Sequence, residues 1–323
     1  MGSIVSMLTK GIGVNMRLDK KLGIKYPFIQ GGMANIATGE FAAAVSNAGG
    51  LGLIGAGGMN VEMLEENIHK CRTLTEKPFG VNIMLMNPQA AEMAELVYRE
   101  NIPVVTTGAG NPSVYMDKWK EKGILVMPVM SSVLIAQKLE KCGADYIIAE
   151  GTESGGHVGE MTTMALVPQM VDALSIPVIA AGGIADGRQL LAAFALGASG
   201  VQLGTCLLAS EECPIHENYK QAVLKARDND TIVTGRIGGT PVRILKNQMA
   251  REYVRREKEG ADKMELEKYT LGSLRRAVFE GDTKTGSLMA GQVAGQVKDI
   301  RPISDILKDL YDGALETMKG LTM

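Results

Sequence analysis

The chain has 323 residues, of which 46% are hydrophobic and 22% charged, and its formal net charge is −2. This near-neutral balance, with only 4% aromatic residues, argues against a nucleic-acid groove of basic and interleaved aromatic side chains. The four cysteines form no C-x-x-C pair, which argues against a zinc module and is typical of free thiols in a cytoplasmic protein. No apolar run reaches the roughly 18 residues of a membrane span.

Residues 1–15 carry a single charge, Lys10, and no sustained apolar core. We therefore expect a short N-terminal extension rather than a secretory signal, with the folded part starting near Met16.

Short apolar runs then recur along the chain, each of a length suited to a strand. They cover residues 28–30, 51–54, 79–84, 104–107, 124–129, 146–149, 178–181 and 201–203. Consecutive apolar residues are expected of parallel strands that are buried on both faces. Segments of helical periodicity separate these runs, and Asn111 followed by Pro112 is a typical helix start.

About eight strands alternating with helices predict an α/β fold, a (β/α)₈ TIM barrel over residues 16–212. A doubly wound open sheet is the rival, but it would have fewer strands and a longer excursion where the strand order reverses. The number of strands favours the barrel.

The alternation stops after Thr205. Residues 213–285 predict a helical cap beside the barrel mouth, with helices expected over 218–227, 242–258 and 265–279. Residues 286–323 are expected to return to the barrel, with an amphipathic helix over 304–319.

The run Gly50-Leu51-Gly52-Leu53-Ile54-Gly55 matches the G-x-G-x-x-G dinucleotide fingerprint. That fingerprint must follow a strand and open a helix. Here the intervening residues are apolar and form the expected strand itself, so we reject a Rossmann interpretation.

In a barrel of this kind the active site lies at the carboxyl ends of the strands. Glycine follows nearly every expected strand, and the seventh and eighth are followed by Gly182-Gly183 and by Gly204-Thr205. Glycine lets backbone N–H groups approach an anion, and the positive end of a following helix adds to the attraction. These two loops therefore predict a phosphate site.

His157 is the only histidine near the end of an expected strand. Its side chain titrates near neutral pH, so it is the candidate for proton transfer. The chain has no G-x-S-x-G elbow and no H-E-x-x-H motif, which argues against a serine hydrolase and against a metal site.

Six segments carry a family resemblance. They are 26–34 (YPFIQGGMA), 77–84 (KPFGVNIM), 105–112 (VTTGAGNP), 150–157 (EGTESGGH), 180–187 (AAGGIADG) and 287–292 (SLMAGQ). Together they resemble the FMN-dependent enoyl-acyl-carrier-protein reductase II of bacteria, from about Met16 to the end of the chain. The wider superfamily includes nitronate monooxygenases, formerly called 2-nitropropane dioxygenases, which share the Gly-Gly-His element.

The resemblance implies bound FMN and assigns residues to it. Gln30, Gly31, Gly32 and Met33 would line the isoalloxazine, and Asn82 and Glu150 would bond its polar edge or the ribityl chain. Gly182, Gly183, Gly204 and Thr205 would hold the phosphate, and the further cofactor residues would be Gly155, Gly156, Ala181 and Met289. His157 would be the catalytic residue.

The implied activity is reduction of the trans-2 double bond of enoyl-acyl carrier protein by NADH or NADPH through FMN, the last step of the bacterial fatty-acid elongation cycle. The resemblance also implies a homodimer and leaves a monovalent cation open as a further cofactor. The alternative is a nitronate monooxygenase, which uses FMN and O₂. A non-catalytic flavin-binding protein and a barrel dehydrogenase with a loop cysteine are weaker rivals.

Two positions depart from the family pattern. Asn35-Ile36 stands where relatives often carry an aromatic residue, and Cys206-Leu207 replaces a more usual Arg-Phe. The cap also has a basic stretch, which the resemblance links to docking of an acidic carrier protein. It contains Arg243, Lys246, Arg251, Arg255, Arg256 and Lys258.

Overall fold

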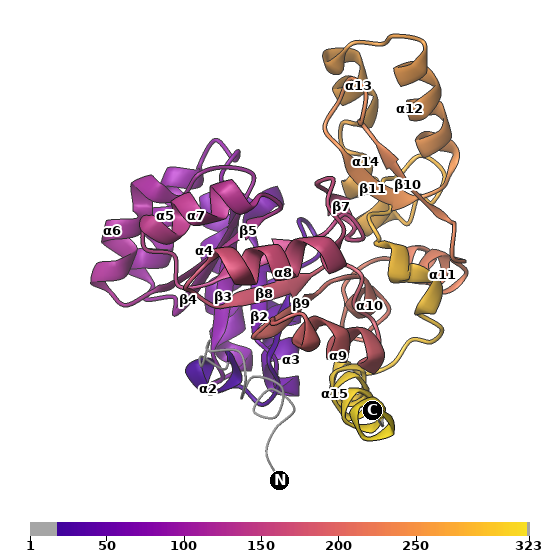
Figure 1. The fold of residues 1–323 in the computed structure, drawn as a ribbon. Coiled ribbons are helices and arrows are strands. Elements are labelled where there is room, and N and C mark those ends of the chain that lie inside the picture. Colours follow the sequence, from indigo (N-terminus) through magenta and orange to yellow (C-terminus); the bar gives the residue numbers. More distant parts are fainter. Residues whose placement is uncertain (1–17, 322–323) are drawn as a thin grey trace.

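The computed structural model describes residues 18–321, so the extension predicted over residues 1–15 lies outside the described residues. Eight parallel strands form a barrel surrounded by helices (Figure 1). The barrel strands are β1 (Phe28–Gln30), β2 (Gly52–Gly55), β3 (Phe79–Met84), β4 (Val104–Gly108), β5 (Leu125–Met130), β6 (Ile147–Glu150), β8 (Val178–Ala181) and β9 (Gly200–Leu203). The predicted TIM barrel is confirmed, and the strand over residues 52–55 confirms that the G-x-G-x-x-G match is not a dinucleotide motif.

The barrel closes where β1 meets β2. The other strands are hydrogen-bonded in the order β1-β9-β8-β6-β5-β4-β3-β2. At the seam, the Gln30 amide N–H donates to the Leu51 carbonyl at 2.9 Å and the Leu51 N–H donates to the Phe28 carbonyl at 2.8 Å. Only this short pairing completes the ring, which excludes the open doubly wound sheet.

The barrel interior is packed with side chains from alternate positions of the strands. Ile29, Leu53 and Ile148 are among them, all fully buried. Leu18 of the short helix α2 (Leu18–Leu22) packs against this interior cluster. The helix lies beneath the amino-terminal ends of the strands (Figure 1), so the opposite end alone is left for a cavity.

Helices cover the outside of the barrel. In chain order they are α3 (Gly39–Ala48), α4 (Val61–Leu74), α5 (Ala90–Arg99), α6 (Ser113–Glu121), α7 (Val133–Lys141), α8 (Thr163–Ala173) and α9 (Gly187–Ala195), with the C-terminal α15 (Ile303–Gly320) in the eighth place. The α15 helix packs against both α9 and α3. Its buried face includes Ile306, Leu307 and Leu310, as the amphipathic pattern predicts.

The cap departs from the prediction of helices alone. Residues 242–258 were expected to form one helix, but β11 (Val242–Leu245) pairs antiparallel with β10 (Thr231–Thr234) before α12 (Gln248–Lys258) begins. The β-branched Val242 and Ile244 favour the strand, and Asn247 caps the helix by accepting a bond from the Ala250 N–H. The remaining cap elements are α11 (Glu217–Leu224), α13 (Lys263–Thr270), α14 (Ser273–Arg275) and a π-helical turn (Arg276–Glu280) in place of one helix over 265–279.

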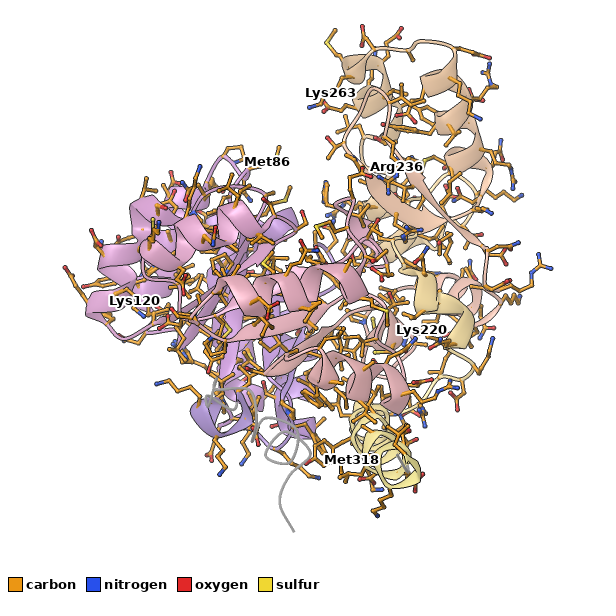
Figure 2. All side chains as sticks on the ribbon, in the orientation of Figure 1. Met86, Lys120, Lys220, Arg236, Lys263 and Met318 are labelled. Atoms are coloured by element: carbon orange, nitrogen blue, oxygen red, sulfur yellow. The ribbon has the colours of Figure 1, made fainter. Side chains whose placement is uncertain are left out.

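Several contacts join the cap to the barrel, and two of them hold the elements nearest the barrel mouth. The two-residue strand β7 (Gly156–His157), which lies in the loop after β6, pairs with β11 and makes a three-stranded sheet with β10. The buried ammonium of Lys220, on α11, donates to the Ser210 carbonyl at 2.6 Å (Figure 2). The domain boundaries at residues 212 and 285 stay predictions.

None of the described helices combines the length and the apolar character that crossing a bilayer requires.

The crossing of α9 and α15 provides a test of this packing. A Cβ on Gly187 would lie 2.2 Å from the Gly313 carbonyl carbon and 2.3 Å from the Ala314 nitrogen, so Gly187→Ala must push the two backbones apart. We expect this variant to lose about 1–3 kcal/mol of unfolding free energy in a urea titration.

The matched control is Gly313→Ala on the facing helix. Its Cβ would lie 3.5 Å from the Gly187 Cα, an ordinary contact, and alanine is favoured over glycine inside a helix by about 0.5–1 kcal/mol. This variant should be as stable as the parent or more so. Equal stability of the two variants would contradict the close crossing.

Candidate active site

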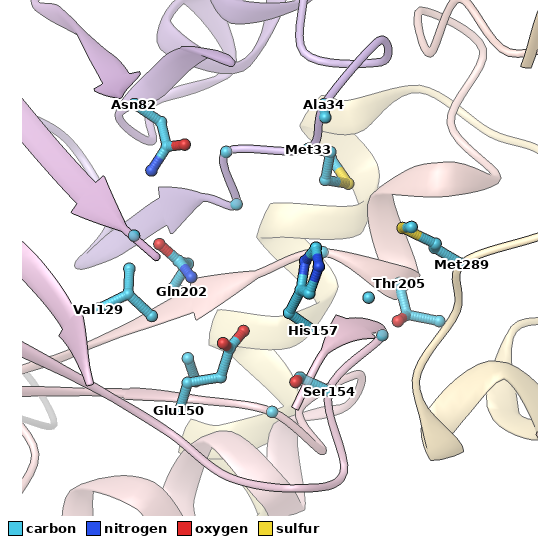
Figure 3. Close-up of a pocket in the computed structure, with 18 of the residues that line it drawn as sticks. Met33, Ala34, Asn82, Val129, Glu150, Ser154, His157, Gln202, Thr205 and Met289 are labelled. Carbon is cyan, nitrogen blue, oxygen red and sulfur yellow. The ribbon is translucent and has the colours of Figure 1, made fainter. Parts of the chain in front are cut away.

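A cavity of about 470 Å³ opens at the carboxyl ends of the barrel strands (Figure 3). His157 lines it, as does each predicted cofactor residue except Gln30. The barrel brings these residues together from loops that are far apart in the sequence. The cap contributes Leu274 to the same cavity, and the segment that follows the cap contributes Met289 and Val293.

Gln30 lies behind the cavity wall. Its side chain is buried, and its Oε1 accepts a hydrogen bond from the Leu53 N–H at 3.2 Å. This bond extends the seam between β1 and β2. Gln30 thus takes part in barrel closure through its Oε1, while its buried Nε2 has no hydrogen-bond partner within the described residues, and its contact with a cofactor stays a prediction.

The predicted phosphate end lies at the loops after β8 and β9. Gly182 and Gly183 have φ values of +94° and +75°, which side-chain-bearing residues rarely adopt. Gly204 has an ordinary negative φ, and a Cβ built on it would meet only the Met33 sulfur, at 4.0 Å. A side chain at Gly204 would therefore occupy the cavity without a clash in the protein, and the glycine leaves that volume for a ligand.

Only one of the two helices after these loops offers a free positive end. The N-terminus of α9 is closed by Asp186, whose carboxylate accepts from the N–H groups of Arg188 and Gln189. The short helix α10 (Thr205–Leu208) has no side-chain cap. The sequence suggested that the positive end of a helix could attract an anion at both loops. Of these two helices, only α10 has a start that is free to do so.

Thr205 and its neighbour Cys206 lie at the predicted phosphate end of the cavity and determine which side-chain groups an anion would meet there. The Thr205 Oγ1 accepts from the Gly291 N–H at 2.8 Å, which leaves its own hydrogen to donate into the cavity. Burial raises the pKa of the Cys206 thiol to about 12, so this residue brings no charge where relatives often have arginine. An anion bound here would accept hydrogen bonds from backbone N–H groups and from the Thr205 hydroxyl.

The floor of the cavity carries polar side chains. Asn82 donates through Nδ2 to the Thr106 hydroxyl at 2.8 Å, which leaves its oxygen for the cavity. Burial raises the pKa of the Glu150 carboxyl from 4.5 to about 7, with only the nearby Ser154 hydroxyl opposing the rise. This shift moves the ionisation of the carboxyl toward neutral pH.

Among the lining residues that sequence reasoning did not assign to the site are two with buried polar side chains, Ser154 and Gln202. The Ser154 Oγ, which lies beside the Glu150 carboxyl, and the Gln202 Oε1 are buried and make no hydrogen bond of good geometry within the described residues. Buried polar atoms are normally paired, so these two indicate a ligand or water in the cavity. A polar residue inside the apolar run 201–203 was the signal that could have revealed Gln202.

The backbone of His157 is fixed by the cap. His157 pairs with Val242 of β11, and the next N–H, of Val158, donates to the Pro241 carbonyl at 3.2 Å. The imidazole stands in the cavity (Figure 3) and forms no hydrogen bond to any described side chain. Although the His157 side chain is exposed to the open cavity, the surrounding protein desolvates the ring in part, which lowers its pKa from 6.5. The neutral imidazole is thus free to exchange a proton with a ligand.

Met289 faces this histidine loop from the cap. Its backbone bridges to Ile244 of β11, and its carbonyl accepts from the Tyr219 hydroxyl at 2.7 Å. Its sulfur lies 3.5 Å from the position of a Cβ on Gly156. Both Met289 and His157 therefore depend on the position of β11.

The basic stretch of the cap is largely neutralised, contrary to the expectation of an open positive face. Arg243 is buried and donates to the Thr152 carbonyl and the Thr231 hydroxyl. Arg255 pairs with Glu252 and Glu259, and Arg256 pairs with Glu252. Lys246 donates to the Asn229 carbonyl. Arg251 and Lys258 are the members of the stretch without an ion pair or side-chain hydrogen bond to any described residue.

Among the described residues, one group is close enough to share a metal ion: Glu65, His69 and Glu100. It lies on the helices α4 and α5 and includes none of the residues that line the cavity. Glu100 is already bonded to the guanidinium of Arg72.

The chain is similar in sequence to several known proteins. A family model described as nitronate monooxygenase matches residues 15–105 and 94–313. A probable nitronate monooxygenase of Staphylococcus saprophyticus is 34% identical, over 86% of this chain and 92% of that protein. A (3aS,4S,5R,7aS)-5-hydroxy-7a-methyl-1-oxo-octahydro-1H-indene-4-carboxyl-CoA dehydrogenase of Rhodococcus jostii is 31% identical, over 94% and 97%.

Two solved structures extend the comparison. FabK from Thermotoga maritima is 48% identical, with a TM-score of 0.92 over 95% of this chain and 98% of that one. A nitroalkane oxidase from Streptomyces ansochromogenes is 27% identical, with a TM-score of 0.83 over 95% and 100%. The protein belongs to the nitronate monooxygenase family of oxidoreductases.

Proposed function

We propose that this protein is an FMN-dependent enoyl-acyl-carrier-protein reductase that uses NADH or NADPH. The observation that carries the proposal is the likeness to FabK, an enoyl-acyl-carrier-protein reductase of type II, at 48% identity over 95% of the chain. The likeness to the nitroalkane oxidase structure is lower, at 27% identity over the same share of the chain.

The cavity fits the proposed cofactor. Gly204 leaves open volume beside the uncapped start of α10, which suits a terminal phosphate. The unpartnered Gln202 Oε1 and Ser154 Oγ offer hydrogen bonds to a polar ligand, and Asn82 offers its free oxygen. Bound FMN would supply the hydride transfer between the nicotinamide and the enoyl double bond.

The protein's own part in the reaction is to position groups and to move a proton. His157 would deliver a proton from its imidazolium to the α-carbon of the substrate. Its backbone is held by β11, which keeps the ring at the centre of the cavity. Ile36, Leu274 and Val293 give the cavity apolar walls that suit an acyl chain and exclude water.

We also propose an acyl carrier protein as the partner that delivers the substrate. An acidic acyl carrier protein would meet Arg251 and Lys258 as the cations of α12 that lack a partner among the described side chains. NADH or NADPH as donor, a homodimer, a cytoplasmic location and a monovalent cation stay predictions from the resemblance.

A nitronate monooxygenase is the second candidate. The family model favours it, and so does the lowered pKa of His157, because a base must be neutral before it can accept a proton. In that case His157 would remove the proton next to the nitro group, and O₂ would be a co-substrate.

The first prediction concerns the cofactor. Purified protein should be yellow and should release FMN rather than FAD. Gly204→Val should abolish flavin retention, because its side chain would fill the volume proposed for the phosphate. Its apo form should melt within a few degrees of the parent apoprotein, since that side chain meets no described atom closer than 4.0 Å at Cβ. A Gly204→Val protein that stays yellow would contradict this placement.

The second prediction concerns His157. His157→Ala should lower turnover of an enoyl thioester by roughly 10²–10⁴-fold, the usual contribution of a general acid. Flavin content, measured from the visible spectrum, should stay unchanged. Unchanged turnover would assign the proton to another group or to water.

The third prediction separates the two candidate activities. As an acid, His157 must be protonated, so kcat/KM for the enoyl thioester should fall as pH rises through its lowered pKa. As a base it must be neutral, so turnover of a nitronate would fall as pH drops through the same value. NAD(P)H should bleach the flavin without oxygen in a reductase. Nitronate turnover with no such bleaching would favour the monooxygenase.

A further inference from the structure

The loop that follows β6 carries His157 at its far end. Three of its seven residues, 151–157, are glycines, and Gly156 has a φ of +81°. Glycine leaves the backbone many conformations, so the loop sequence alone does not fix where the imidazole lies. The pairing of Gly156 and His157 with β11 holds the end of the loop. The position of the ring therefore also depends on how the start of the loop is held.

Arg243 holds the start of the loop from the same strand of the cap. Its backbone pairs with Gly156, whereas its side chain reaches back to the Thr152 carbonyl, to which Nε donates at 3.0 Å. Side chains alternate between the two faces of a strand, so Arg243 lies on the face opposite to Val242 and its partner His157. One residue of β11 thus spans the loop from end to end without lining the cavity.

The polar groups of Thr152 are all engaged. Its N–H donates to the Met161 carbonyl at 2.7 Å, and its hydroxyl accepts from the Arg236 Nη2 at 3.3 Å. Arg236 is also paired with the exposed Glu160, at a surface where water competes for both groups. Among the described residues, Arg243 is the one donor to the Thr152 carbonyl, and it is buried. It is therefore the part of this anchor that water does not replace.

The charge of Arg243 has no ion pair among the described residues. Only 6% of the residue is exposed, and its Nη1 donates to the Thr231 hydroxyl at 3.0 Å. Glu153, the acidic residue that acts on this charge, accepts from the N–H and the hydroxyl of Thr163 instead. A buried guanidinium is less favourable than an apolar side chain of similar volume unless its hydrogen bonds are used. The two acceptors that Arg243 joins therefore account for an arginine here.

We propose that Arg243 is a positioning residue for His157, because its bond to the Thr152 carbonyl fixes the start of the loop whose end carries the imidazole. This inference rests on the proposed proton transfer by His157. It moves Arg243 from the basic docking stretch, where the resemblance placed it, to the interior of the enzyme. A displaced imidazole would meet the substrate poorly, and a misplacement of about 1 Å can lower a rate about 10²-fold.

Arg243→Met tests the proposal, because methionine fills a similar volume and offers no donor. We expect kcat for an enoyl thioester to fall roughly ten- to hundredfold, with KM changed by less than about twofold. FMN content and the anaerobic rate of flavin reduction by NAD(P)H should stay as in the parent, since neither uses the imidazole. An equal fall in the rate of flavin reduction would place the damage at the flavin and overturn the inference.

A double-mutant cycle asks whether Arg243 acts through His157. Added to His157→Ala, Arg243→Met should change enoyl turnover by less than about twofold, because the group that it positions is already absent. The same loss of turnover in both backgrounds would overturn the inference. Arg243→Lys keeps the charge but lacks the fork that joins two acceptors, so it should recover part of the lost kcat. It takes the place of Arg243→Met in these tests if that variant does not fold.

Thr231→Val is the matched control. It removes the other acceptor of the same guanidinium and leaves the bond to the Thr152 carbonyl in place. Both variants should melt at a lower temperature than the parent, because each loses a hydrogen bond of the buried guanidinium. Only Arg243→Met should lose kcat. An equal loss of kcat in Thr231→Val would assign the effect to the stability of the cap and overturn the inference.

Proton NMR of the apoprotein gives a readout that needs neither flavin nor turnover. The chain has three histidines, and the His157 signals are identified by their loss in His157→Ala. The protein around this ring lowers its pKa from 6.5. Release of the loop by Arg243→Met should expose the ring and move its titration back toward 6.5, while His69 and His216 titrate as in the parent.

The NMR result separates the inference from the proposed function. An identical titration of His157 in the parent and in Arg243→Met would overturn the inference, whichever reaction the protein catalyses. Absence of enoyl turnover in the flavin-loaded parent would overturn the proposed function, whereas a moved titration would still support the placement of the imidazole by Arg243.

Discussion

The arrangement of the site depends on one short backbone pairing, in which Gly156 and His157 lie antiparallel to β11 of the cap. Without it, the loop after β6 would have no partner at the point where it carries the imidazole. The same strand bridges to Met289, so β11 positions residues from two distant parts of the chain. The barrel supplies the cavity floor, and β11 of the cap fixes the positions of His157 and Met289 above that floor.

The cavity is electrostatically simple. Its two titratable groups among the described lining residues, Glu150 and His157, both have pKa values displaced toward the neutral form by burial. The loops at Gly183 and Gly204, which we propose as the phosphate site, offer an anion backbone N–H groups rather than charged side chains. A ligand with one anionic end and a largely neutral body suits this division.

The barrel was predictable from the sequence because buried parallel strands leave uninterrupted apolar runs. Strands β1, β3 and β8 have the predicted bounds for this reason. The strand β7 was not predictable, because a strand of two residues is too short to show an alternating hydrophobic pattern. The strand β11 was taken for helix because of its charged neighbours, although Arg243 is a buried hydrogen-bond donor.

The candidate site was largely predictable, because the fold gathers the carboxyl ends of all strands at one rim. The exceptions are local. Gln30 was placed at the rim by its position in the chain, yet its side chain bonds sideways across the barrel seam. The Asp186-x-x-Gln189 capping box was visible in the sequence and already implied that the N–H groups of Arg188 and Gln189 are taken by the Asp186 carboxylate.

The position of α15 has a consequence for biosynthesis. The last helix of the ring is encoded after the whole cap, and it covers the flank between α9 and α3. While the ribosome is still adding residues 303–320, the nascent chain holds all eight strands but leaves apolar surface of α9 and α3 uncovered. That surface is a natural binding site for a chaperone during translation, and a chain truncated before Ile303 would keep it exposed permanently.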